Sequence, residues 1–134
     1  MLRAALLAAL VPACARAESP RPSVLLVTVD TLRADHLSCY GYERATSPNL
    51  DALAQESLLF EDASSPRAKT TPAIASLLSG LYPHSHGVRD LAAPLASGPR
   101  LLQEVLRDHG YETGAIVGNY VLTNARSGLA RGFD

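Results

Sequence analysis

The stretch Lys-Thr-Thr-Pro-Ala-Ile-Ala-Ser-Leu-Leu-Ser-Gly, residues 69–80, predicts a turn that leads into a helix. Pro72 suits a first helical turn, because its missing N–H is one of the donors that a helix start leaves unpaired. Thr70 or Thr71 then takes the N-cap, and Gly80 ends the helix. Apolar residues recur behind the cap at helical spacing: Ile74, Leu77, Leu78 and Leu81. The stretch therefore holds a hydroxyl at a helix start, where free N–H groups favour an anion, although threonine is also an ordinary cap.

A second stretch, Ser23-Val-Leu-Leu-Val-Thr-Val-Asp30, is a continuous apolar, β-branched run that ends in a carboxylate. Such a run is typical of a strand buried on both faces of a parallel sheet. Ligands of open α/β sheets bind at the carboxyl ends of the strands, which is where Asp30 lies. The Asp30 carboxylate and a threonine hydroxyl could therefore share one metal ion, with the Lys69 cation beside them.

The remaining predicted elements alternate between helices and strands, an order typical of α/β crossovers. They are a helix that begins at Ser47-Pro48, a short strand over 57–60, a covering helix over 100–109 that Gly110 stops, a buried strand over 111–118, and a loop over 124–134.

Three motifs follow one another along the chain. They are Val-Asp-Thr-Leu-Arg-Ala-Asp-His-Leu-Ser-Cys-Tyr-Gly-Tyr (29–42), Ser-Pro-Asn-Leu-Asp-Ala-Leu-Ala (47–54) and Ala-Ser-Leu-Leu-Ser-Gly-Leu-Tyr-Pro-His-Ser-His-Gly-Val (75–88). Together they resemble the sulfatase family of the alkaline phosphatase superfamily, over roughly residues 22–134. The resemblance implies an α/β sandwich around a central mixed, largely parallel sheet. It also implies that this chain is only the N-terminal portion of that domain.

The resemblance implies attack by a metal-bound nucleophile on a sulfate or phosphate ester. Asp30 matches the family's first metal ligand. Thr70 falls at the nucleophile position, two residues before the proline of the Cys-x-Pro-Ser-Arg signature, and would also bind the metal. Lys69 would help to hold the anionic substrate. Oxygen ligands favour calcium, magnesium or manganese over zinc.

Several residues depart from the family pattern. Sulfatases oxidise a Cys or Ser to formylglycine, an aldehyde that Thr70 cannot give because its β-carbon carries a methyl group. Ala73 and Ile74 replace the Ser-Arg of the signature, and Thr31 replaces the second residue of the family's Asp-Asp pair. Residues 118–121 fall near the Gly-Lys-Trp-His run of sulfatases, but lack its Lys and His. A threonine after lysine looks more like the phosphoryl, phosphonyl and phosphoglycerol-transferring branches, so the substrate need not be a sulfate.

Other polar residues leave two interpretations open. His36 is either a ligand or acid near Asp30 or a surface or loop-packing residue, and the second interpretation is favoured. His84 and His86 could bind a metal if their segment were extended, but the family uses this run mainly to turn the chain. Asn119 follows a predicted strand, where it contacts substrate or forms a turn.

The N-terminus predicts a secretory signal peptide. Arg3 precedes an apolar run over residues 4–13, and Ala-Arg-Ala follows at 15–17 as a cleavage pattern. The run is too short to span a bilayer, which takes about 20 residues. The alternative is a lipobox that would lipidate Cys14. The predicted division is therefore signal peptide 1–17, linker 18–22 and partial catalytic domain 23–134, with export to the periplasm, the medium or a lipid-anchored place on the cell envelope.

Composition narrows the classes of partner. The chain has 134 residues and a formal net charge of −1, which gives no argument for nucleic acid or for an anionic membrane surface. Removal or lipidation of Cys14 leaves Cys39 alone, so no disulfide framework forms. Any membrane attachment would come through a lipid on Cys14, and the oligomeric state stays open.

Two functions remain. The first is a metal-dependent hydrolase or transferase that acts on small-molecule, glycan or lipid esters of sulfuric, phosphoric or phosphonic acid. The second is a catalytically incomplete fragment, because the family's second metal-ligand cluster, an Asp with a His or Asn, lies beyond the residues that the resemblance covers.

Overall fold

The computed structural model describes residues 21–91 and 93–134, so the predicted signal peptide, Cys14 and most of the predicted linker lie outside the described residues. The elements are η1 (Ala34–His36), η2 (Ser38–Tyr40), α1 (Pro48–Gln55), α2 (Thr70–Ser79), α3 (Pro83–His86), α4 (Leu102–Asp108), η3 (Tyr120–Leu122) and α5 (Asn124–Ser127). No strand occurs among the described residues. No helix in this part of the chain is long and apolar enough to cross a membrane.

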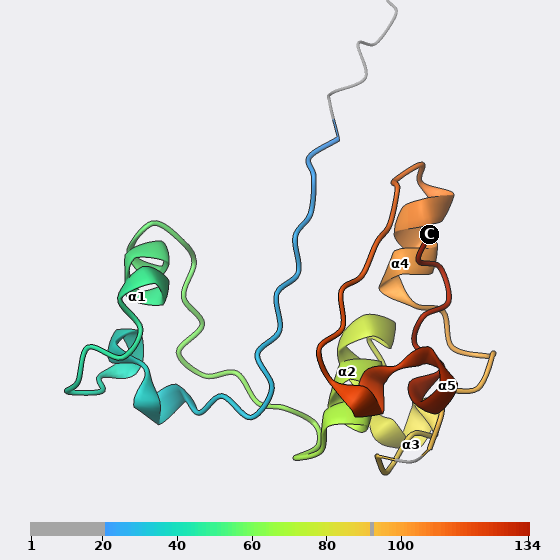
Figure 1. Ribbon diagram of the computed structural model, residues 1–134, viewed down its shortest axis with the longest axis horizontal. Helices are drawn as coiled ribbons and strands as arrows, with labels where there is room; N and C mark the ends of the chain where they lie inside the picture. Colours follow the sequence, from blue (N-terminus) through green and yellow to red (C-terminus); the bar gives the residue numbers. More distant parts are fainter. Residues whose placement is uncertain (1–20, 92) are drawn as a thin grey trace, which may run out of the picture.

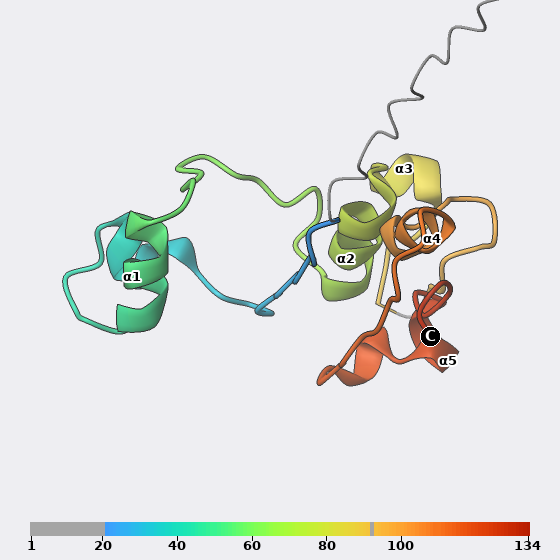
Figure 2. The ribbon, with the colours of Figure 1, turned by 90° about the horizontal axis from the view of Figure 1, so that it is seen from above.

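The helices gather in two groups. Helix α1 lies with η1 and η2, whereas α2, α3, α4, η3 and α5 form a second group, and the two groups stay apart in both views (Figures 1 and 2). The chain first runs past the second group in an extended path, continues to α1, and returns over residues 56–69 to α2 (Figure 1). Two long connections without a helix or strand therefore separate the α1 group from the group that contains α2.

Helix α2 confirms the predicted helix and its end at Gly80, which adopts the left-handed conformation with φ 68°. The predicted cap is wrong, because Lys69 takes the N-cap position. Both threonine hydroxyls make tertiary contacts instead. The Thr70 Oγ1 faces Asp30, and the Thr71 Oγ1 donates to the Leu91 carbonyl oxygen over 3.2 Å.

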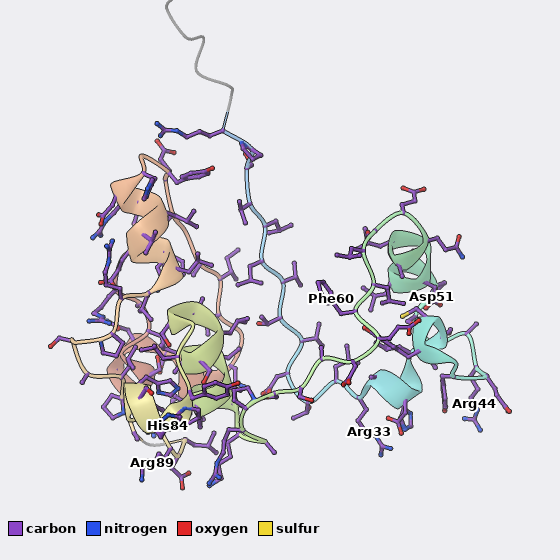
Figure 3. The ribbon with its side chains drawn as sticks, turned by 180° about the vertical axis from the view of Figure 1, so that it is seen from behind. Arg33, Arg44, Asp51, Phe60, His84 and Arg89 are labelled. Carbon is purple, nitrogen blue, oxygen red and sulfur yellow. The ribbon has the colours of Figure 1, made fainter. Side chains whose placement is uncertain are left out.

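Helix α1 begins after Ser47, as predicted. The Ser47 Oγ accepts from the Ser38 N–H over 3.2 Å and donates to the Asp51 carboxylate over 3.0 Å. That carboxylate also accepts from the Cys39 N–H over 2.9 Å, so it ties η2 to α1 (Asp51 is labelled in Figure 3). Cys39 is a half-buried free thiol, as expected.

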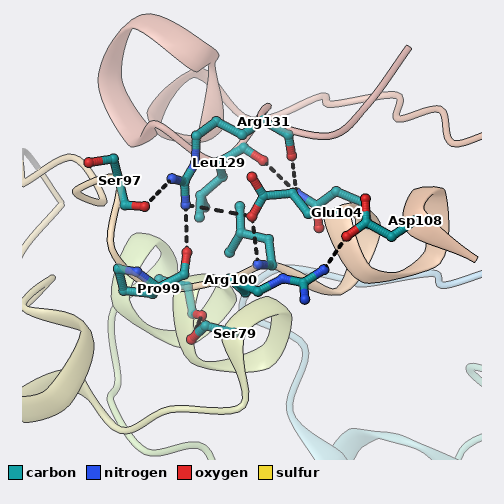
Figure 4. A network of polar contacts seen from close by, with 11 residues as sticks. Ser79, Ser97, Pro99, Arg100, Glu104, Asp108, Leu129 and Arg131 are labelled. Carbon is teal, nitrogen blue, oxygen red and sulfur yellow. Dashed lines mark hydrogen bonds and ion pairs between the residues drawn. The ribbon is translucent and has the colours of Figure 1, made fainter.

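Helix α4 is shorter than predicted and ends at Asp108, before Gly110, whose φ is 78°. The Glu104 carboxylate accepts from the Leu101 N–H over 2.8 Å at the first turn. Arg131 joins the chain's last segment to this helix start (Figure 4). Its guanidinium donates to the Ser97 and Pro99 carbonyl oxygens over 2.9 and 2.8 Å and lies 3.9 Å from Glu104.

The hydrophobic core is small and surrounds α2. The buried apolar residues of the described chain are Ala75, Val88, Leu95, Leu101 and Leu129, with Ile74, Leu78, Ala93 and Leu122 partly buried against them. Helix α2 packs against α3, α4 and η3, so it is the centre of its group. This packing fixes the helix that carries Thr70.

The three predicted strands are corrected. Segments 23–30, 57–60 and 111–118 form no strand. Residues 23–30 and 114–118 are exposed, with Leu25 87% and Ile116 105% exposed, whereas Thr113 is buried. A strand needs a hydrogen-bonded neighbour, and no described residue pairs with these segments in a sheet ladder. Phe60, on the return segment between the two groups, is likewise 64% exposed (Figure 3). The short helix α5 lies within the range predicted as a loop.

The exposed apolar run allows a direct test. We expect Leu25→Lys combined with Ile116→Lys to lower the fluorescence of a bound hydrophobic dye and to slow aggregation, because both side chains lie in solvent. Thermal unfolding should change little, by roughly 0.5 kcal/mol or less, as for other surface substitutions.

The matched control is Leu101→Ala, which empties a fully buried position and should cost about 2–5 kcal/mol. Unfolding of the double lysine variant would contradict the exposed placement of these two segments.

Candidate active site

The Asp30 carboxylate brings together three segments that are far apart in sequence. The Thr70 Oγ1 lies 3.1 Å from Asp30 Oδ1 and 3.2 Å from Oδ2. The Asn119 Nδ2 donates to Oδ2 over 2.6 Å. The structure therefore places the predicted pair Asp30 and Thr70 in direct contact, and it adds Asn119 as a third member.

Asn119 is held in one orientation by its own backbone. It caps η3, and its Oδ1 accepts from the Val121 N–H over 3.1 Å. With the amide oxygen used in this way, the amide nitrogen faces Asp30. The sequence predicts that Asn119 follows a strand, but it does not pair Asn119 with Asp30. The pattern that could have revealed the pair is that each polar side chain follows an apolar run.

The backbone reverses directly after Asp30. Thr31 has φ 55°, and it is the one non-glycine residue with positive φ among the described residues. A β-branched residue in this left-handed region is strained, at a cost of about 1–3 kcal/mol, and such residues concentrate at functional sites. The strain thus lies at the position where the family's second Asp is replaced.

Thr70 is held firmly because its neighbours are buried. Thr71 and Pro72 are buried and Thr70 is half-buried, whereas Asp30 is exposed. The Thr70 hydroxyl donates to a carboxylate. Hydrogen bonds to carboxylates are stronger than hydrogen bonds to neutral acceptors. The arrangement therefore presents an oriented hydroxyl, in contact with a proton acceptor, at the first turn of a helix.

Lys69 points to a different carboxylate. Its Nζ lies 2.9 Å from Asp90 Oδ2, and the hydrogen bond from Lys69 lowers the pKa of the Asp90 carboxyl. In this state the Lys69 charge is partly neutralised. An anionic substrate would have to compete with Asp90 for it, and both side chains are exposed enough for that exchange.

The structure favours the structural interpretation of His36, His84 and His86: His86 is buried, whereas His36 and His84 are exposed and lie against aromatic rings. His86 is buried in α3, with its Nε2 2.9 Å from the Ser76 Oγ, and its Nδ1 accepts from the Val88 N–H over 3.1 Å. Both ring nitrogens are used, so the metal alternative is wrong for His86. His84 stacks on Tyr82, with ring centroids 5.9 Å apart (His84 is labelled in Figure 3), and His36 lies 4.9 Å from the Tyr42 ring.

The donor set fits a hard divalent cation in chemistry. Asp30 and Thr70 present oxygen atoms, which suit calcium, magnesium and manganese. The Asn119 amide oxygen is occupied by Val121, so this residue acts through its nitrogen on Asp30. Among residues 21–91 and 93–134 no group of three or more His, Cys, Asp or Glu side chains could hold a metal ion.

Comparison with known proteins shows the family to which the chain belongs. Residues 22–134 match the sequence profile of the family described as Sulfatase. An N-acetylglucosamine-6-O-sulfatase of Bacteroides thetaiotaomicron is 29% identical over 84% of this chain and 20% of its own length. Human arylsulfatase A is 37% identical over 69% of this chain and 20% of its own length.

A solved structure agrees with these relatives. The phosphonate monoester hydrolase of Agrobacterium radiobacter superposes with a TM-score of 0.72 at 32% identity, over 85% of this chain and 25% of that one. The chain belongs to the sulfatase family. It spans about a fifth of the length of the curated relatives that it matches.

The buried His86 predicts a pH dependence of stability. Burial lowers the pKa of the His86 imidazole, so the folded state prefers the neutral ring. Below about pH 6.5 the unfolded chain binds a proton that the folded chain resists. We therefore expect the free energy of unfolding to be highest above that pH and to fall as the pH is lowered through 6.5 toward 5. Urea unfolding at several pH values measures this.

The control variants separate this ring from its neighbour. His86→Gln should lose most of this pH dependence, whereas His84→Gln, which changes an exposed ring of the same helix, should keep it. An unchanged pH profile in His86→Gln would show that another group is responsible.

Proposed function

We propose that this chain carries the nucleophile of a metal-dependent hydrolase or transferase of sulfuric, phosphoric or phosphonic esters, and that Thr70 is this nucleophile. The observation that supports the proposal is the Thr70 hydroxyl, which is held at the start of α2 and bonded to the Asp30 carboxylate. Family membership and the phosphonate monoester hydrolase neighbour support the same chemistry.

The reaction follows from these contacts. The Thr70 oxygen attacks the phosphorus or sulfur atom, and its proton passes to the Asp30 carboxylate. A new bond forms from the Thr70 oxygen to this atom as the bond to the alkoxide or aryloxide breaks. The leaving oxygen takes its proton from solvent. Water then releases the transferred group from Thr70, or an acceptor hydroxyl takes it in a transferase.

Two residues prepare the carboxylate and the substrate for this step. The Asn119 side-chain N–H donates to Asp30 Oδ2 and so orients the carboxylate. Lys69 exchanges Asp90 for an oxygen of the anionic ester. A divalent cation, held by Asp30 and Thr70, would lower the pKa of the hydroxyl and offset the negative charge of the transferring group.

The chemistry of threonine favours phosphoryl or phosphonyl transfer over the formylglycine route. The hydroxyl-bearing carbon of Thr70 carries a methyl group, so its oxidation does not give an aldehyde. We also propose that segments 23–29 and 111–118 become strands of a sheet when hydrogen-bonding neighbours are present, because their ends already meet at Asp30 and Asn119. We also propose that the predicted signal peptide, residues 1–17, directs export of the protein.

A second function has its own observation. Among the described residues, no group of three or more His, Cys, Asp or Glu side chains could hold a metal ion, whereas calcium or magnesium takes six or more ligands. A protein with these residues alone would bind the cation weakly and turn over slowly. It would then be a catalytically incomplete member of the family.

Turnover of 4-nitrophenyl esters decides between the two functions. Sulfate, phosphate, phosphodiester and phenylphosphonate esters are offered to the purified chain with calcium, magnesium, manganese or zinc. We expect Thr70→Ala and Asp30→Ala to lower kcat/KM at least about 1,000-fold, because the nucleophile and its acceptor act as a unit. Thr70→Ser should keep measurable activity.

The control is Thr46→Ala, which removes a threonine hydroxyl from the α1 group. Equal activity of Thr70→Ala and the parent would contradict the proposed nucleophile. The absence of turnover with every metal would favour the incomplete member.

Asp90 gives a separate test of Lys69. We expect Asp90→Asn to lower KM for an anionic ester about two- to fivefold, because it frees the Lys69 ammonium from an exposed ion pair of modest strength. Lys69→Gln should raise KM. A higher KM in Asp90→Asn would show instead that the pair only positions the start of α2.

A further inference from the structure

A shallow cavity lies beside η3 and α5. Its volume is about 470 Å³, and its lining residues are Pro94, Tyr120, Thr123, Ala125 and Arg126. Its walls combine an aromatic ring and small apolar groups with one guanidinium. No residue of the reaction proposed above lines it.

The Arg126 guanidinium is held in place by Tyr120. It lies 4.2 Å from the centre of the Tyr120 ring, and its Nη2 donates to the Tyr120 hydroxyl. A guanidinium that is already stacked on an aromatic face loses less conformational freedom on binding a ligand than an unstacked one does. The stacked pair is therefore a pre-positioned donor group.

The charge of Arg126 is not neutralised within the described chain. The ion pairs of residues 21–91 and 93–134 use Arg33, Lys69, Arg100 and Arg131. Arg126 keeps donors beyond the one that Tyr120 accepts, because a guanidinium carries five N–H groups in a planar fork. Such a fork fits the oxygen pair of a carboxylate, sulfate or phosphoryl group.

The cavity and the candidate active site are joined through η3. Tyr120 directly follows Asn119, whose amide contacts Asp30. Element η3, which contains Tyr120, packs against α2, whose first residue is Thr70. An ester that reacts at Thr70 could therefore extend along η3 to Arg126.

We propose that the cavity is a second anion-binding subsite, which recognises a carboxylate, sulfate or phosphoryl group on the part of the substrate away from the reacting centre. The inference rests on the proposed function and names its substrate class, an ester that carries a second negative charge on a ring or other flat body. Tyr120 and Pro94 contact that body, and Arg126 binds its anion.

Equilibrium binding tests the subsite independently of turnover. Isothermal titration calorimetry compares 4-carboxyphenyl phosphate with phenyl phosphate on the whole chain, with Thr70→Ala as the background that prevents hydrolysis. We expect the carboxylate-bearing ligand to bind about fivefold more tightly, which is the size of an exposed ion pair. The preference should shrink as sodium chloride is raised from about 50 mM to 500 mM.

Matched variants assign the preference. Arg126→Gln should abolish it, and Tyr120→Phe, which keeps the ring and loses the hydroxyl, should reduce it. Arg107→Gln removes the same charge from an exposed position of α4 and should leave the preference unchanged.

Three outcomes overturn the subsite. They are equal affinity for the two ligands, a preference that survives in Arg126→Gln, and no measurable binding of either ligand. Failure of the proposed function has a different signature, because absent turnover in the parent chain leaves the binding preference and its loss in Arg126→Gln intact.

Discussion

The hydrogen bonds to Asp30 are the constraint on which the candidate site depends. They join an extended segment, the start of α2 and the entry to η3, which are separated by 40 and 89 residues. Each is exposed and would contribute only about 0.5–1.5 kcal/mol net. The contacts therefore orient the groups, whereas the stability of the region comes from the packing of α2. Thr71 and Thr70 divide these tasks, because successive helical residues point in different directions. Thr71 is buried against Leu91, and Thr70 faces Asp30.

The sequence predicted what local signals determine. Pro72 and Gly80 mark a helix through backbone geometry alone, and the structure follows them closely. The cap was misassigned because Thr70 has a long-range partner that outweighs local capping. The meeting of Asp30 with Thr70 was foreseen from the apolar run that ends at Asp30. The exposure of that run was not foreseen, because burial depends on neighbours that no local pattern reveals. Asn119 was not paired with Asp30 for the same reason.

The histidines also show that residue spacing alone does not determine where side chains point. Two rings two residues apart share one side only in an extended segment. Pro83 begins a helical turn instead, so His84 and His86 point in different directions, one to solvent and one into the core. Sequence spacing named both as ligand candidates, and the backbone conformation then removed His86. The buried ring instead joins α2 to α3 through Ser76.

The charges around Thr70 lead to a requirement for a cation. An anionic ester that approaches Thr70 also approaches the Asp30 carboxylate, and two unit charges about 4 Å apart repel by about 1 kcal/mol in water and by more in a less polar site. Lys69, the nearest basic residue in sequence, is already paired with Asp90. Asn119 contributes a dipole and no net charge. In the proposed reaction, the charge of the ester would therefore be offset by a metal ion on Asp30, by release of Lys69 from Asp90, or by both. The proposed role of Arg126 is different. It would bind the anion at the other end of the ester, and it would leave the repulsion between the reacting group and Asp30 unchanged.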